Sequence, residues 1–135
     1  MRLSRARQDE VINHLLGELE AAIMRLMWQR ESATVRDILD ALNQSGRPLA
    51  YTTVLTVMSR LVVKGVLARE RSGKTHIYRT AATEEEFLQH AAAQRVHALI
   101  EEFGDLAITH FITEISELSP KRRRQLEQMV KGDEP

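Results

Sequence analysis

The stretch AYTTVLTVMSRLVVKG, residues 50–65, decides the fold. At about 100° per residue, its apolar side chains fall within roughly 100° of Val54, which predicts an amphipathic helix over 50–64 with one face in a core. This apolar face comprises Val54, Leu55, Val57, Met58, Leu61 and Val62. The opposite face comprises Thr52, Thr56, Ser59, Arg60 and Val63, flanked by Thr53 and Lys64. Gly65 follows where a helix end favours glycine.

The polar face of this helix is rich in hydroxyl side chains. Threonine is a poor helix former, so Thr52, Thr53 and Thr56 need an explanation. The major groove of DNA supplies one, because short side chains let a helix sit deep, hydroxyls reach base edges and methyls pack on thymine. Arg60 and Lys64, one and two turns further on, suit a guanine or a phosphate. The alternative is an ordinary solvated helix face, on which glutamate and lysine would be commoner.

A β-hairpin is predicted directly after this helix. Strands are expected over about 66–70 and 75–79, with Ser72-Gly73-Lys74 as the turn. Its basic side chains are Arg69, Arg71, Lys74, His76 and Arg79. They can lie over the backbone or minor groove of DNA, or they can serve as a charged edge that blocks sheet-to-sheet pairing. Tyr51 also has two interpretations: its hydroxyl can reach a phosphate, or its ring can pack against the preceding helix.

Two helices are predicted before this segment. Apolar residues at spacings of three and four indicate a helix over 17–30. A second helix over 34–43 begins with the capping-box pattern Thr34 and Asp37. Residues 1–15 are polar and basic, and we expect a loose arm or an additional helical turn there. Trp28 lies among apolar residues and is expected in the core.

A second, all-helical region is predicted from another capping box, Thr83 and Glu86. The first helix is expected to run from this capping box to about Phe103, and a second over 105–117 after the break at Gly104. A third is expected to begin at Ser119-Pro120 and to end at about 129. Two of them carry apolar stripes: Leu88, Ala92, Val96, Leu99 and Phe103, then Ile108, Phe111, Ile112 and Ile115. A single short layer of helices cannot bury both stripes, so a second copy of the chain is the expected cover.

The charge distribution agrees with this division. The 135 residues carry no net formal charge, but residues 1–80 hold 13 lysines and arginines against 8 acidic residues, and residues 81–135 hold 6 against 11. A basic half beside an acidic half is compatible with one half meeting a polyanion.

The absence of cysteine excludes disulfides and thiolate metal sites. No apolar run approaches the roughly 20 residues that span a bilayer, and we expect a cytoplasmic protein.

Enzyme activity is not expected. The sequence has no glycine-rich phosphate loop, no G-x-S-x-G and no H-E-x-x-H motif. His90 and His97 share a helix face at spacings that permit metal ligation, but solvated or partly buried helix histidines give the same pattern. We predict no metal, no cofactor and no convergent polar pocket.

Three stretches together resemble the penicillinase-repressor family of winged-helix regulators, the BlaI/MecI/CopY group. They are Leu19–Met24 with Leu26 and Trp28, Thr34–Ile38, and Ala50–Val54 continuing to Arg60-Leu61 and Lys64-Gly65. The segment His76-Ile77-Tyr78 is similar as well.

The resemblance implies a homodimer that represses transcription from a palindromic operator, often of β-lactamase or related resistance genes. In classical members a membrane-bound sensor metalloprotease triggers cleavage of the repressor. The family's scissile Asn-Phe pair is absent here, since the asparagines are Asn13 and Asn43. The cysteine cluster of the copper-responsive branch is absent too.

We therefore predict a mainly α protein with a small β-hairpin wing: an N-terminal arm over 1–16, a winged-helix DNA-binding domain over 17–80 and a helical dimerisation region over 81–135. The DNA-binding residues are expected to be Tyr51, Thr52, Thr53, Thr56, Arg60, Lys64, Arg71, Lys74 and His76. A winged-helix adaptor that binds only proteins is the alternative, although its exposed helix would carry large apolar anchors.

Overall fold

The protein divides into two compact units. The computed structural model describes residues 3–132. The first unit comprises Leu3–Gln89, and the second begins at His90. The boundary falls within one continuous helix, α5, Glu84–Phe103.

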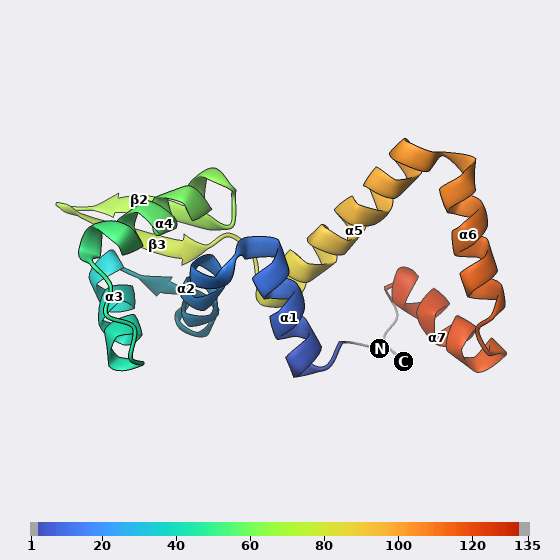
Figure 1. The fold of residues 1–135 in the computed structure, drawn as a ribbon, viewed down its shortest axis with the longest axis horizontal. Coiled ribbons are helices and arrows are strands. Elements are labelled where there is room, and N and C mark those ends of the chain that lie inside the picture. Colours follow the sequence, from blue (N-terminus) through green and yellow to red (C-terminus); the bar gives the residue numbers. More distant parts are fainter. Residues whose placement is uncertain (1–2, 133–135) are drawn as a thin grey trace. The chain divides into compact units, whose positions relative to one another are not determined.

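The first unit contains four helices, a small sheet and the first turns of α5 (Figure 1). Its elements are α1 (Arg5–Leu16), α2 (Glu18–Arg30), β1 (Ser32–Ala33), α3 (Val35–Gln44), α4 (Tyr51–Val63), β2 (Leu67–Ser72) and β3 (Thr75–Thr80). From α2 onward this is the order of a winged helix-turn-helix, with α3 and α4 as the two crossing helices and β2–β3 as the wing. The predicted fold class is confirmed.

The sheet has three antiparallel strands in the order β1-β3-β2. The sequence did not reveal β1, because two residues are too few for an alternating pattern. It pairs Ser32 with Arg79 and Ala33 with Tyr78. Ser72 pairs with Thr75, so the hairpin turn is the two-residue Gly73-Lys74. Gly73 adopts φ +64°, where glycine is unstrained.

The core lies where α1, α2, α3 and α4 meet the sheet. Its fully buried side chains are Ile12, Ala21, Ile23, Met24, Met27, Ile38, Val54, Met58, Leu61 and Tyr78. Trp28 packs against this cluster as predicted. Its indole nitrogen donates to the carbonyl oxygen of Ala82 at 3.1 Å, and its ring lies 5.6 Å from that of Phe87.

Helix α1 occupies the N-terminal segment for which the sequence allowed either a loose arm or an additional helical turn. Ser4 caps it by accepting from the backbone nitrogen of Arg7 at 3.2 Å. Ile12 is fully buried and Leu16 is 6% exposed. The sequence hid this helix because only one narrow edge of it is apolar while its remaining side chains are charged or polar. Burial of that edge against α2 makes residues 5–16 part of the first unit.

The second unit contains the rest of α5, then α6 (Asp105–Ser116) and α7 (Pro120–Val130). Gly104, at φ +60°, separates α5 from α6 as predicted. Ser119 caps α7 by accepting from the nitrogen of Arg122 at 3.1 Å. No residue of α5, α6 or α7 is buried. Across residues 3–132, none of the helices is both long and apolar enough to span a bilayer.

Candidate DNA-binding surface

Helix α4 presents the two faces that the sequence predicts. Val54, Met58 and Leu61 are fully buried. Thr52, Thr53, Thr56 and Arg60 are exposed, as is Val63 at 87%. The packing of the apolar face on α2 and α3 therefore holds the hydroxyl face outward, rigidly attached to the core.

Thr56 is prepared for one particular kind of contact. Its hydroxyl donates to the carbonyl oxygen of Thr52 at 2.8 Å, one helical turn back. A hydroxyl has one donor and two acceptor positions. With the donor engaged, Thr56 offers acceptors, which suit the exposed amino groups of adenine or cytosine in the major groove.

The two basic residues of α4 differ in their surroundings. Lys64 lies 2.8 Å from the carboxylate of Glu20 in α2, whose side chain is 13% exposed. Arg60 makes no ion pair within residues 3–132 and is exposed. Arg60 is therefore free to meet a guanine or a phosphate, whereas Lys64 would have to share or leave Glu20.

The wing carries both tethered and free cations. Arg71 donates from Nε to the carbonyl oxygen of Gly73 at 2.9 Å and braces the turn. Arg79 pairs with Glu70 across the hairpin at 2.8 Å. Lys74 and His76 are exposed and have no polar partner in the described part of the chain. Arg69 on β2 is also exposed and unpaired within residues 3–132, so the cations available to a polyanion lie on β2, at the turn and at the start of β3.

Tyr51 packs toward the preceding helix, one of its two predicted arrangements. The guanidinium of Arg36, in the first turn of α3, lies 5.4 Å from the centre of the Tyr51 ring. The ring remains 43% exposed. Arg36 was not among the candidate DNA-binding residues predicted from the sequence. Its position two residues after the N-cap Thr34, at the exposed start of α3, could have indicated it.

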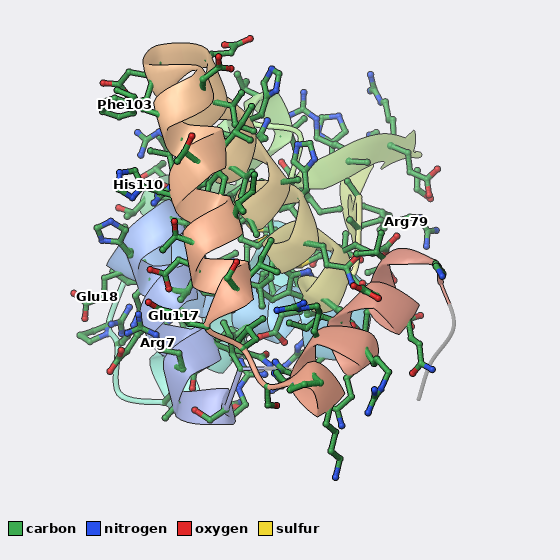
Figure 2. All side chains as sticks on the ribbon, turned by 90° about the vertical axis from the view of Figure 1, so that its right-hand side faces the viewer. Arg7, Glu18, Arg79, Phe103, His110 and Glu117 are labelled. Atoms are coloured by element: carbon green, nitrogen blue, oxygen red, sulfur yellow. The ribbon has the colours of Figure 1, made fainter. Side chains whose placement is uncertain are left out.

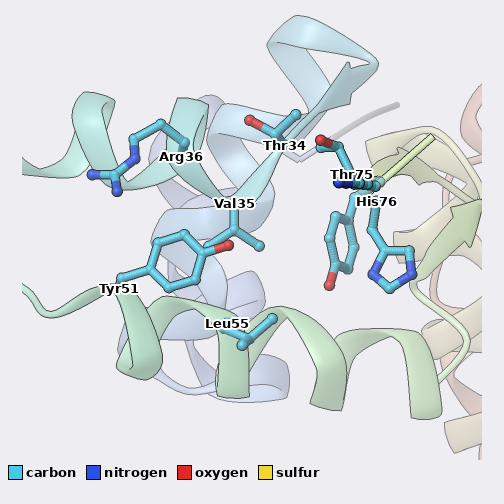
Figure 3. Close-up of a pocket in the computed structure, with 9 residues that line it drawn as sticks. Thr34, Val35, Arg36, Tyr51, Leu55, Thr75 and His76 are labelled. Carbon is cyan, nitrogen blue, oxygen red and sulfur yellow. The ribbon is translucent and has the colours of Figure 1, made fainter. Parts of the chain in front are cut away.

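A groove of about 530 Å³ lies between the first turn of α3, the start of α4 and the wing (Figure 3). Its lining is Thr34, Val35, Arg36, Tyr51, Leu55, Lys74, Thr75, His76 and Tyr78. The sequence predicted no convergent polar pocket, because these residues come from three separate segments. The fold brings them together.

The predicted dimerisation residues behave in two ways. Six of them are each 42–58% exposed: Val96, Leu99, Phe103, Ile108, Ile112 and Ile115. Phe103 is labelled in Figure 2. Ala92 is exposed and Phe111 is half-buried. Leu88, in contrast, packs against the core of the first unit. Leu106, 65% exposed, was not among the predicted residues.

The topology of the first unit defines a winged helix-turn-helix protein with an additional N-terminal helix. The chain belongs to the penicillinase repressor family, whose profile matches residues 16–132. Helix α1 lies almost wholly before that range.

Proteins similar to this chain include two known sequences and one solved structure. A protein of Mycobacterium tuberculosis described as the transcriptional regulator BlaI is 35% identical over 123 residues, which cover 87% of this chain and 86% of that protein. An uncharacterised 16.5 kDa protein of Latilactobacillus sakei is 33% identical over 72 residues, 53% of this chain and 49% of that protein. The solution structure of the DNA-binding domain of the repressor BlaI aligns with 48% of this chain and 78% of that one, at 23% identity and a TM-score of 0.44.

Proposed function

We propose that this protein is a transcriptional repressor that binds a palindromic operator as a homodimer, with α4 as the helix that reads the bases. The observation that carries the proposal is the outward face of α4. Thr52, Thr53, Thr56 and Arg60 are exposed on a helix whose other face is locked in the core. Family membership supports the same function.

The wing and the start of α4 supply contacts to the DNA backbone. Lys74 and His76 are exposed and unpaired within residues 3–132. Arg71 keeps its terminal guanidinium nitrogens available while Nε holds the turn. Contacts of this kind position a protein on the duplex without reading its sequence.

The homodimer is proposed from the apolar surface of the second unit. Side chains such as Leu106 and Ile112 are 65% and 58% exposed, and helices α5 to α7 contain no buried residue. Large contiguous apolar surface is uncommon on monomers and marks an interface. A second copy would place two reading helices on the two halves of a palindrome.

Selection of bound duplexes from a random pool tests the proposal. The full chain is expected to enrich a sequence with twofold symmetry, and the enriched duplex should bind one dimer in analytical ultracentrifugation. Enrichment of no sequence, with binding equal to that of random DNA, would contradict the proposal and favour the protein-binding adaptor.

We further propose that repression ends when the dimer is lost, with a membrane sensor protease acting upstream. Two linked half-sites raise affinity through effective concentration, so a monomer would lose several orders of magnitude in affinity. The α5–α6 junction at Gly104 is the expected weak point, since Gly104, at φ +60°, interrupts the helix and leaves the backbone less protected. A specific protease site inserted there should release the operator on cutting. Release by stoichiometric zinc or copper from the intact chain would contradict this route and implicate His90 and His97.

A further inference from the structure

The groove between α3, α4 and the wing combines an apolar floor with a basic rim. Val35 is 4% exposed and Tyr78 is fully buried, and Leu55 is partly buried. The rim is formed by Arg36, Lys74 and His76, all exposed. Figure 3 shows Arg36 and His76 on either side of Val35 and Leu55.

The groove is lined by basic but not by acidic side chains. None of its nine lining residues is acidic. The nearest carboxylate in sequence, Asp37, accepts the backbone N–H of Thr34 at 3.0 Å in the capping box. Hydroxyl donors are present as well, since Thr34, Tyr51 and Thr75 line the same space. The groove therefore favours an anion.

Tyr78 adds an unsatisfied polar atom to this site. Its side chain is fully buried, and its hydroxyl has no hydrogen-bond partner among residues 3–132. A buried hydroxyl without a partner is destabilising, and most such groups are satisfied by protein, water or ligand. An acceptor atom seated deep in the groove would supply that partner after a small adjustment of the ring.

We infer that this groove binds a small organic anion with an apolar body, and that its occupancy excludes operator DNA. Leu55 and the Tyr51 ring, which is 43% exposed, would be left uncovered by a bare phosphate, whereas an aromatic or aliphatic body would bury them. The charged end would lie at the rim between Arg36 and Lys74.

Competition with DNA follows from shared residues. Tyr51, Lys74 and His76 line the groove and belong to the candidate DNA-binding surface. A cationic side chain that pairs with a bound organic anion cannot at the same time form an equally strong ion pair with a DNA phosphate. This second part of the inference rests on the proposed function and would add a direct route of regulation.

Titration of the full chain with 2-naphthoate tests the site itself, without DNA. Isothermal calorimetry should show one site per chain, and the uncharged isostere 2-naphthamide should bind at least tenfold more weakly. The variants Arg36→Gln and Lys74→Gln should each weaken naphthoate binding severalfold. Arg69→Gln is the matched control, because Arg69 is an exposed wing cation outside the groove and should leave binding unchanged. Tyr78→Phe should weaken binding without lowering the melting temperature, since it removes only the unpartnered hydroxyl.

Three results would overturn the inference. The first is equal binding of naphthamide. The second is displacement of naphthoate by inorganic phosphate at equal concentration, which would identify a binding site for a bare DNA phosphate. The third is an equal loss of binding in Arg69→Gln and Arg36→Gln. Fluorescence anisotropy of labelled operator then separates the two proposals. Naphthoate binding by a chain that binds no DNA contradicts the proposed function, and with it the competition, but leaves the anion site standing. Operator binding by a chain that ignores naphthoate contradicts only this inference.

Discussion

The guanidinium of Arg5 holds the carboxylate of Glu84 through two hydrogen bonds, of 3.1 Å and 2.5 Å. Arg5 lies in the first turn of α1 and Glu84 in the first turn of α5. Arg5 also pairs with Asp9, which in turn accepts from Arg25 of α2 at 3.3 Å. Helix α1 thus connects the starting turn of α5 to α2 within the first unit, and it does so with residues that precede the family profile.

The burial of α1 predicts that it stabilises the first unit chiefly through apolar contacts. Ile12→Ala should lower the free energy of unfolding by about 2–5 kcal/mol, the usual range for a fully buried large-to-small change. Urea denaturation followed by circular dichroism measures it. Arg7→Ala, on the exposed side of the same helix, is the control and should change stability by less than about 0.5 kcal/mol. Equal small effects would mean that α1 behaves as the loose arm.

The ion pairs around Asp9 predict a dependence of stability on pH. Hydrogen bonding to Arg5, opposed by partial desolvation, holds the pKa of Asp9 below its ordinary value of 3.8. A carboxyl group with a lowered folded-state pKa stabilises the fold above its unfolded pKa, and this contribution is lost as the pH falls through the folded pKa. The stability difference between the native chain and Asp9→Asn should therefore be constant near neutrality and shrink below about pH 4. A difference that persists unchanged at pH 2.5 would exclude this ion pair as its source.

The parts of the fold that the sequence predicted are those with strong local signals. Val54, Met58 and Leu61 repeat with helical period, and Thr34 with Asp37 marks a helix start, so α3 and α4 could be placed closely. The missed parts depend on tertiary contacts. Two residues of β1 become a strand only because β3 offers hydrogen bonds to them.

In the candidate site, too, the residues with a local sequence signal were predicted and those that depend on tertiary contacts were not. The exposed threonines follow from the period of α4 alone. The pairing of Lys64 with Glu20 joins residues 44 apart in sequence, and no local pattern predicts it. The groove, likewise, needs three segments that only the folded chain brings together.

The exposed threonines predict base-specific contacts. Thr52→Ala and Thr56→Ala should each cost about 1–3 kcal/mol on the selected operator and reduce discrimination against mismatched sites. Fluorescence anisotropy on cognate and random duplexes measures both effects. Thr109→Ala is a matched control, because Thr109 makes the same back-bond, to Asp105 at 2.8 Å, but on α6. Equal weakening of cognate and random binding by the α4 variants would exclude this helix as the reader.

The free and paired lysines predict different salt dependences. Lys74→Ala should weaken binding to all sequences similarly and lower the slope of log affinity against log salt by about one, the loss of one phosphate contact. Lys64→Ala should change the slope by less, because Nζ of Lys64 already lies 2.8 Å from Glu20. Anisotropy titrations over a range of salt concentrations measure both slopes. The reverse order of the two slopes would show that Lys64 leaves Glu20 to contact DNA.

The exposed apolar surface of α6 predicts that single charges will separate the dimer. Ile112 is 58% exposed and lies on a helix with no buried residue, so the lone chain tolerates a charge there. In a dimer interface the same charge would be removed from water without a partner, which is strongly unfavourable. Ile112→Asp should therefore shift the sedimentation equilibrium toward monomer and weaken operator binding while leaving the melting of the first unit unchanged. Thr113→Asp, also exposed but outside the apolar stripe, is the control. A dimer that survives Ile112→Asp with unchanged affinity would place the interface elsewhere on the chain.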